Sequence, residues 1–323
     1  MCTAITFKGE GKYFGRNLDL EYRYDERVTI TPRNYILRYK SGEIERRHFA
    51  MIGMATVIDR YPLYYDAINE YGLGIASLNF EGNAHYNKDE CNDKNLAPYE
   101  LTLFLLGRCK TVKEAIDDID KINLVDIQFN SNFPNTPLHW ILADKKECVV
   151  IEYMKDDKRI YSNPIGVLTN NPPFDFHLMN LNHFINLTRN EPACSFAVDV
   201  ELTRISRGLG ALGLPGDNSS ASRFIRAAFA KLNSIVTNTK LDDIGQVFHI
   251  LRSVEQVEGT VKTAHGFEKT QYSSCCDLDE GVYYYTTYNN FQINAVGLRN
   301  VDLEGDQITS YNLNDSQEIK YIN

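Results

Sequence analysis

The sequence predicts a layered α+β fold, in which strands and helices occur in separate runs along the chain. Short β-prone segments gather near both ends and again in the middle, and helical segments stand between them without strict βαβ alternation. The chain is also rich in aromatic residues, with 20 Tyr and 16 Phe against one Trp, and such side chains pack well on pleated surfaces.

Short runs of β-branched and aromatic residues, bounded by Gly or charged residues, are typical of strands. The predicted strands cover residues 3–7, 13–17, 28–31, 50–57, 73–80, 138–143, 148–153, 165–169, 270–276, 282–287 and 292–296. Longer segments with apolar residues at helical spacing, such as Leu101, Phe104 and Leu105, predict helices. The predicted helices cover residues 99–109, 112–122, 175–187, 220–232 and 243–254.

Length and composition describe a globular chain. The 323 residues are 43% hydrophobic and 24% charged, and no Pro/Gly/Ser linker divides them, so we expect a single domain over residues 1–323. A net charge of −9 repels phosphate backbones and disfavours a nucleic-acid partner. No apolar run is long enough to span a membrane and no leader pattern opens the chain, which predicts a cytoplasmic protein without a membrane partner.

Cysteine and histidine usage gives no sign of a cofactor. The seven Cys are odd in number and include no C-x-x-C pair, which argues against a disulfide framework or a zinc ribbon. Six of them are expected to be small buried hydrophobes. The seven His form neither H-x-x-x-H nor H-E-x-x-H, so we expect no metal and no cofactor.

Cys2 differs from the other cysteines because of its position. Removal of Met1, which a small second residue permits, would leave a first residue that carries both a thiol and a free α-amine. Free thiols titrate near pH 8.5 and α-amines at about 7.7–8.0. The amine is therefore partly neutral near pH 7 and can accept the thiol proton, as in N-terminal Thr enzymes. Cys2 is a candidate nucleophile.

Charged residues follow in the segment Phe-Gly-Arg-Asn-Leu-Asp at 14–19. Alternation along a strand sends Arg16 and Asn17 to opposite faces. Arg16 beside Cys2 would favour the thiolate, and Asp19 could orient the amine by accepting its hydrogens. Exposed charges would be the alternative explanation.

Two Asn residues end apolar strands and are candidate donors for an oxyanion. Asn79 ends the run Gly-Leu-Gly-Ile-Ala-Ser-Leu-Asn, and Asn170 ends Gly-Val-Leu-Thr-Asn. A donor that binds the oxygen of a tetrahedral intermediate contributes roughly 3–4 kcal/mol. The alternative is that these Asn residues form turns, which is common before Pro.

The segment 206–217 contains a formal G-x-G-x-x-G. We reject a dinucleotide site there, because no clear strand precedes the motif and a Pro-Gly-Asp turn separates it from the next helix. A flexible loop is the better interpretation. Ser219 or Ser220 would then cap the helix that carries Arg223 in its first turn.

Together these segments resemble the choloylglycine hydrolase family, which holds bile salt hydrolases and penicillin V acylases. The resemblance runs nearly end to end. It rests on Met-Cys-Thr at the N-terminus, residues 14–19, Ser-Leu-Asn-Phe at 77–80, Val-Leu-Thr-Asn-Asn-Pro at 167–172, and Leu-Pro-Gly-Asp followed by Ser-Arg-Phe within 214–224. It implies the four-layer αββα sandwich of N-terminal-nucleophile hydrolases, often a homotetramer of gut bacteria. The implied catalytic residues are Cys2, Arg16, Asp19, Asn79, Asn170 and Arg223.

The implied activity is cleavage of the amide bond in glycine- and taurine-conjugated bile salts through a Cys2 thioester. Asn79 favours bile salts, since penicillin V acylases tend to carry Tyr there. The triplet Ser-Arg-Gly at 206–208 resembles a loop variant associated with taurine conjugates, and Arg207 could offer a fork of donors to a sulfonate. Leu20, Tyr24 and apolar residues near Phe133 are expected to form the sterol pocket, with Arg16 and Asn79 also contacting substrate.

Three alternatives stay open at this point. The first is a penicillin V acylase with the same machinery and a different acyl pocket. The second is transfer of the bile acyl group to other amines, which a thioester permits. The third is a non-catalytic sterol-binding protein on the same fold, against which the retained set of six polar residues speaks.

Overall fold

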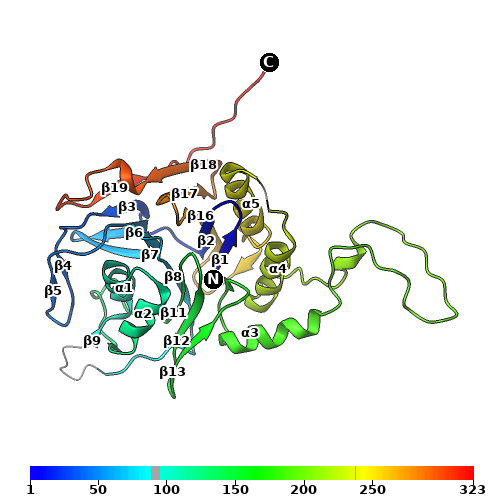
Figure 1. Ribbon diagram of the computed structural model, residues 1–323, viewed down its shortest axis with the longest axis horizontal. Helices are drawn as coiled ribbons and strands as arrows, with labels where there is room; N and C mark the ends of the chain where they lie inside the picture. The colour runs from blue at the N-terminus through cyan, green and yellow to red at the C-terminus, as the bar shows by residue number, and fades with distance from the viewer. Residues whose placement is uncertain (89–94, 237) are drawn as a thin grey trace.

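The computed structural model describes residues 1–88, 95–236 and 238–323, and two large antiparallel sheets form its centre (Figure 1). The seven-stranded sheet has the order β14-β1-β2-β16-β17-β18, with β15 paired to β16. Its strands are β1 (Cys2–Lys8), β2 (Lys12–Leu20), β14 (Val167–Leu168), β15 (Val261–Lys262), β16 (Phe267–Asp277), β17 (Val282–Thr287) and β18 (Asn290–Gly297).

The eight-stranded sheet has the order β13-β12-β11-β8-β7-β6-β3-β19. Its strands are β3 (Arg27–Thr31), β6 (Met51–Ile58), β7 (Tyr61–Asn69), β8 (Gly74–Asn79), β11 (Leu138–Ala143), β12 (Cys148–Tyr153), β13 (Lys158–Ser162) and β19 (Thr309–Asn312). Two small pairs complete the strands: β4 (Leu37–Arg38) with β5 (Ile44–Glu45), and β9 (Asn95–Leu96) with β10 (Asn123–Leu124).

Helices cover the outer face of each sheet. On the eight-stranded sheet, α1 (Leu101–Arg108) packs against β7 and β8, with α2 (Val112–Ile119) beside it. On the other sheet, α4 (Ser220–Asn233) and α5 (Lys240–Arg252) pack against β1, β2 and β16, and α3 (Phe174–Asn180) contacts α4. The order helix, sheet, sheet, helix confirms the expected αββα sandwich.

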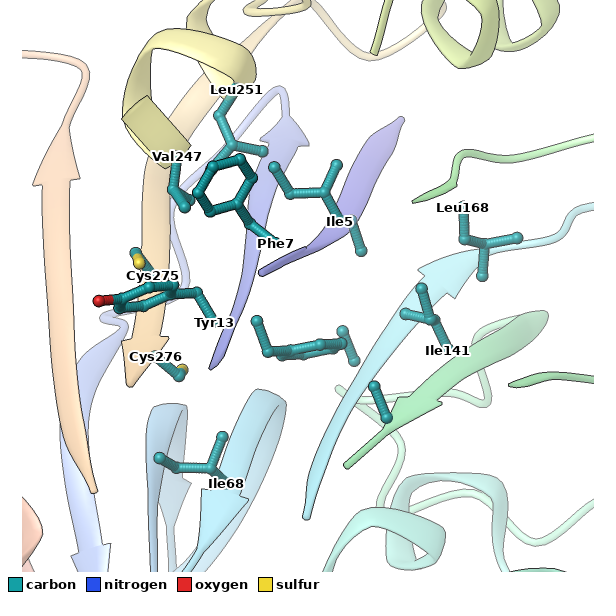
Figure 2. Packing of buried hydrophobic residues seen from close by; sticks show 14 of the residues in the cluster. Ile5, Phe7, Tyr13, Ile68, Ile141, Leu168, Val247, Leu251, Cys275 and Cys276 are labelled. Carbon is teal, nitrogen blue, oxygen red and sulfur yellow. The ribbon is translucent and has the colours of Figure 1, made fainter. Parts of the chain in front are cut away.

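Buried side chains join the layers. Figure 2 shows Val247 and Leu251 of α5 against Ile5 and Phe7 of β1, and Ile68 of the opposite sheet lies within the same cluster. Pairing of Cys2 with Leu18 and of Ala4 with Arg16 puts these four side chains on one face, between the sheets. The next residue of β2, Asn17, faces the helices instead and donates to the Leu251 carbonyl at 2.9 Å. The predicted opposite orientation of Arg16 and Asn17 is confirmed.

Most predicted elements recur with shifted ends, and two differ more. The predicted strand 165–169 is only Val167–Leu168, because Gly166 takes a positive φ of 63° where the chain turns onto β1. The predicted helix 175–187 is shorter, since α3 ends at Asn180 and continues as a 3₁₀ turn over Leu181–Phe184. Among the described residues, no helix is long and apolar enough to cross a membrane.

Candidate active site

Cys2 begins the first strand and points between the two sheets. Its side chain is 3% exposed and lines a cavity of about 320 Å³. The antiparallel pairing of β1 with β2 fixes its neighbours, because Leu18 lies directly opposite and Arg16 two residues along the same face. The thiol is therefore held at the wall of a cavity by two hydrogen-bonded strands.

Arg16 lines the same cavity, and the opposite sheet holds it in place. Its Nη1 donates to the carbonyls of Tyr65 at 2.8 Å and Ser77 at 2.9 Å. Its Nη2 is buried and has no hydrogen-bond partner within the described part of the chain. Burial alone lowers the pKa of this guanidinium, but attraction to the neighbouring Cys2, Tyr272 and Asp66 raises it overall. Arg16 thus offers a charged donor beside the thiol.

Asn170 connects three parts of the site, and its Oδ1 accepts from the Cys2 backbone N–H at 2.8 Å and from Arg223 at 2.6 Å. Its Nδ2 donates to the Asn79 carbonyl at 2.8 Å. These contacts fix the orientation of the amide, because Oδ1 takes two donors and Nδ2 one acceptor. An amide nitrogen carries two hydrogens, so one N–H remains for a further acceptor.

Arg223 enters from the first turn of α4, which Ser219 caps by accepting from the Ser222 N–H. Its Nη1 donates to the Cys2 carbonyl at 2.5 Å and to Thr3 Oγ1 at 2.7 Å, and its Nε donates to the Asn218 carbonyl at 3.0 Å. The guanidinium is fully buried, so it ties the N-terminal strand to the helix layer through charge-assisted hydrogen bonds.

Asp19 lies one residue beyond Leu18 and is also fully buried. Its Oδ1 accepts from Thr270 Oγ1 at 2.6 Å, and within the described residues its Oδ2 has no partner. Burial raises the pKa of this carboxyl, and the charges of Arg223 and the N-terminal amine only partly oppose that rise.

The structure includes Met1, whose α-amine donates to the Asp19 carbonyl at 2.8 Å and forms an ion pair with Glu268. Burial lowers the pKa of this amine. While Met1 is attached, the nitrogen of Cys2 is a peptide N–H and cannot act as a base.

Five residues that the sequence predicted to contact substrate line the cavity beside Cys2. They are Arg16, Leu20, Tyr24, Asn79 and Phe133. The Tyr24 and Phe133 rings lie 6.4 Å apart between centroids, a distance typical of aromatic contacts. Residues that the sequence did not single out complete the wall, among them Leu18, Phe129, Leu138 and Trp140. Its size and mainly apolar lining suit an apolar ligand with a few polar groups.

Several buried polar residues that support the site were missed in the sequence. Asp66 lies between the sheets and accepts from Tyr272, Ser274 and Tyr283 at 2.5–2.9 Å. Burial raises the pKa of the Asp66 carboxyl, and the charge of the nearby Arg16 only partly opposes that rise. An alternation pattern cannot reveal such a residue, because Asp in a strand looks like a solvent-facing position.

Two buried histidines hold the backbone around Asn170. His139 Nε2 lies 3.0 Å from the Thr169 carbonyl and His177 Nε2 lies 2.9 Å from the Asn170 carbonyl. His139 Nδ1 contacts Glu152 Oε1 at 3.1 Å. Burial lowers the pKa of His177 to about 4, so the ring is neutral near pH 7. Local sequence spacing gave no sign of this arrangement.

Arg207 is not among the residues that line the cavity of its own chain. It lies on an excursion, residues 189–208, that extends away from the body between α3 and α4 (Figure 1). The Thr188 N–H donates to the Gly210 carbonyl at 2.9 Å and closes the neck of this excursion. A Cβ at Gly210 would approach the Asn190 carbonyl to 2.1 Å, so the neck requires glycine.

The rejected dinucleotide motif forms no strand-to-helix turn, since a single 3₁₀ turn, Leu209–Ala211, occupies it. One cysteine prediction was wrong, because Cys194 on the excursion is exposed. Cys109, Cys275 and Cys276 are buried as predicted, Cys148 is half-buried, and Cys91 lies outside the described residues.

Comparison with known proteins gives consistent matches. Residues 2–320 match the family model described as linear amide C–N hydrolases, choloylglycine hydrolase family. The chain is 50% identical to a bile salt hydrolase/transferase of Lactiplantibacillus plantarum and 38% identical to one of Clostridium perfringens. Both alignments cover 100% of this chain and 100% of the relative. A solved variant of the conjugated bile acid hydrolase from Clostridium perfringens has a TM-score of 0.92 at 37% identity, with full coverage of both chains.

A more distant structure, penicillin V acylase from Agrobacterium tumefaciens, has a TM-score of 0.78 at 18% identity, covering 96% of this chain and 91% of that one. This likeness establishes the shared fold. It does not bear on the substrate.

Proposed function

The chain belongs to the choloylglycine hydrolase family of linear amide C–N hydrolases, and we propose that it hydrolyses glycine- and taurine-conjugated bile salts. The names of its relatives, bile salt hydrolase/transferase, support this substrate class. The observation that carries the proposal is the position of Cys2, at the wall of an apolar cavity and within reach of Arg16 and Asn170.

The proposed enzyme becomes active when Met1 is removed. The α-amine of Cys2 then occupies the place of the present peptide nitrogen, where Asn170 Oδ1 accepts a hydrogen bond at 2.8 Å. An amine held by an acceptor in this way keeps its lone pair available when it is neutral. It can therefore serve as the base for the thiol of its own residue.

In the proposed acylation step, the Cys2 thiol attacks the amide carbonyl carbon and its proton passes to the Cys2 α-amine. The carbonyl oxygen becomes an oxyanion, which the free N–H of Asn170 Nδ2 and the backbone N–H of Asn79 stabilise. The tetrahedral intermediate collapses and the C–N bond breaks. The α-amine returns its proton to the departing amino group, which leaves as glycine or taurine, and the steroid acyl group remains as a thioester on Cys2.

In the proposed deacylation step, water attacks the thioester carbonyl and gives one proton to the α-amine. Collapse of the second tetrahedral intermediate breaks the C–S bond, and the proton passes to the leaving sulfur. An amine in place of water would yield a new amide. Acyl transfer by the same site is therefore part of the proposal, in agreement with the transferase named for two relatives.

We assign distinct roles to the charged residues. Arg16 lines the same cavity as Cys2, has a buried Nη2 without a partner among the described residues, and attracts the negative charge of the attacking sulfur. Arg223 holds the Cys2 carbonyl and Asn170 together and so positions the nucleophile against the oxyanion donors. Asp19 lies near the N-terminal amine and attracts its protonated form.

The cavity favours bile salts over penicillin V. Leu20, Tyr24 and Phe133 give it an apolar wall for a steroid body, and Asn79 replaces the Tyr expected of penicillin V acylases. Hydrolysis of both substrates by protein that starts at Cys2 tests the assignment. Release of taurine or glycine from taurocholate and glycocholate supports it, and turnover of penicillin V without turnover of either bile salt refutes it.

We further propose taurine preference and a homotetramer. The excursion exposes large apolar side chains, with Phe196 77% and Ile205 92% exposed, and such residues are normally covered. In the proposed assembly the excursion reaches a neighbouring subunit, where Arg207 contacts the sulfonate of the bound substrate. Arg207→Ala should lower the taurocholate-to-glycocholate ratio of kcat/KM, and an unchanged ratio refutes this role.

A mass measurement of the native assembly tests the tetramer. A cytoplasmic location stays a prediction from the sequence.

A further inference from the structure

A second cavity, of about 620 Å³, lies at the far end of the sandwich from Cys2. It is bounded by the end of β1, the start of β2, the turn of residues 144–147 between β11 and β12, and the C-terminal half of α4. Because β1 runs from Cys2 to Lys8 at about 3.3 Å per residue, the two ends are roughly 20 Å apart. This cavity is therefore separate from the proposed catalytic site.

Lysines dominate the charge of the second cavity. Its wall contains Lys8, Lys12, Lys145, Lys146 and Lys231, against the carboxylates of Asp144 and Glu147. A third acid, Asp279, pairs with Lys145 at 2.8 Å and accepts from the Lys12 backbone N–H at 3.1 Å. The cavity thus has a local excess of positive charge in a chain whose net charge is −9. Such a focus of one sign attracts ligands of the opposite sign.

Lys231 and Lys12 are the two half-buried lysines of this wall. Lys231 lies on α4, and its Nζ donates to the Ile165 carbonyl. An ammonium group has three donors, and Lys231 forms no ion pair with a carboxylate of the described residues. Burial lowers the pKa of this amine, which an anionic ligand beside it would oppose. The group is an unpaired cation that faces a cavity.

The rest of the wall is mixed, because the half-buried apolar residues Ile116 and Ile160 lie beside the polar residues Thr6, Ser162 and Asn163. This combination restricts the kind of anion that fits. An inorganic anion such as phosphate would satisfy the lysines but leave most of the space and the apolar residues uncovered. An organic anion with an apolar body matches both parts of the wall.

We propose that this cavity is a second binding site for an amphipathic organic anion, with the carboxylate or sulfonate at Lys231 and the apolar body between α2 and the β1–β2 hairpin. The site itself follows from its lysines and from the apolar residues beside them. The choice of a bile acid as the ligand rests on the proposed function, which makes such molecules the substrates and products of the enzyme.

Cholate is a suitable probe, since it has no amide bond to hydrolyse. Calorimetric titration of the full-length protein counts all binding events, while fluorescence of Trp140, the one Trp, reports on the catalytic cavity that it lines. We expect two binding events per chain by calorimetry and one by fluorescence. The binding event that calorimetry detects and Trp140 fluorescence does not is the silent event. Lys231→Met should weaken its affinity at least about tenfold, since a hydrogen bond to a charged group is lost.

Two further variants keep the test independent of folding effects at the half-buried Lys231. Lys8 and Lys146 are exposed, so the double variant K8E/K146E reverses charge at the rim without disturbing the core, and it should also abolish the silent event. Lys155→Met, an exposed lysine outside the cavity, should leave both events intact. A single event per chain that coincides with the Trp140 response, or a silent event that survives K231M and K8E/K146E, overturns the proposal.

This result is distinguishable from failure of the proposed function. If Trp140 does not respond to cholate, the bile-salt assignment of the catalytic cavity loses support. A calorimetric event that disappears in K231M would still establish the second site. Equal displacement by inorganic phosphate at the concentration of cholate would contradict the need for an apolar body.

Discussion

Asn170 joins the nucleophile, the proposed oxyanion site and Arg223, so its replacement gives an informative perturbation. In Asn170→Ala the Nδ2 donor is lost, and removal of one oxyanion donor costs about 3–4 kcal/mol in the transition state. We therefore expect kcat for taurocholate to fall about 10²–10³-fold with little change in KM, because the donor acts on charge that develops only during reaction.

The same change affects stability. Asn170 Oδ1 accepts from the Arg223 guanidinium at 2.6 Å. In Asn170→Ala this acceptor is absent, so the buried charge of Arg223 loses one hydrogen-bond partner. Such a loss costs about 1–3 kcal/mol. Urea unfolding followed by circular dichroism should show this decrease in the free energy of unfolding.

Two variants separate these effects. Asn170→Asp keeps an acceptor for Cys2 and Arg223 but lacks the amide donor, so activity should fall as much while stability falls less. Asn171→Ala is the matched control, because the Asn171 side chain donates to the Glu81 carbonyl away from Cys2, and its kcat should stay within about twofold. Folded Asn170→Ala protein with kcat reduced less than about tenfold would refute the assigned role.

Two other predictions concern stability. The pKa of His177 is about 4 in the folded chain against 6.5 unfolded, so its neutral form stabilises the fold fully above pH 6.5 and loses that effect as the pH falls toward 4. Unfolding in urea should show about 2 kcal/mol less stability at pH 5 than at pH 7.5. His177→Gln should remove this difference, and a variant that keeps the full difference would contradict the prediction. Phe14 is fully buried between the sheets, so Phe14→Ala should cost about 3–5 kcal/mol, and a cost below about 1 kcal/mol would mean that the inter-sheet core packs differently.

The layered fold was predictable because several strands are short runs of β-branched and aromatic residues. The ranges 138–143, 148–153 and 282–287 match β11, β12 and β17 to the residue. The missed strands have physical reasons. β13 and β19 form the two edges of the eight-stranded sheet and carry mainly polar residues, and β7 contains Pro62 and the buried Asp66, both of which disguise a strand pattern.

Part of the polar centre could be singled out from the sequence, because Cys2 opens the chain and Asn79 and Asn170 end strands, whereas the full set of six was implied by the family resemblance. The structure brings Cys2, Arg16, Asp19, Asn79, Asn170 and Arg223 together through contacts that span up to 221 positions. Supporting residues such as His139 and His177 were not predictable, since their partners are backbone carbonyls from distant segments. The placement of Arg207 depends on the path of an exposed excursion, which local sequence does not determine.

The central claim is that one residue supplies both nucleophile and base, and two preparations of the same chain test it. Cleavage from a fusion partner can yield protein that begins at Cys2 or protein that retains Met1, with intact mass confirming each. Loss of a general base costs about 10²–10⁴-fold. Taurocholate hydrolysis should therefore follow the fraction of molecules that begin at Cys2, at least about a hundredfold above the Met1 preparation. Equal activity in a preparation whose molecules all retain Met1 would contradict the mechanism.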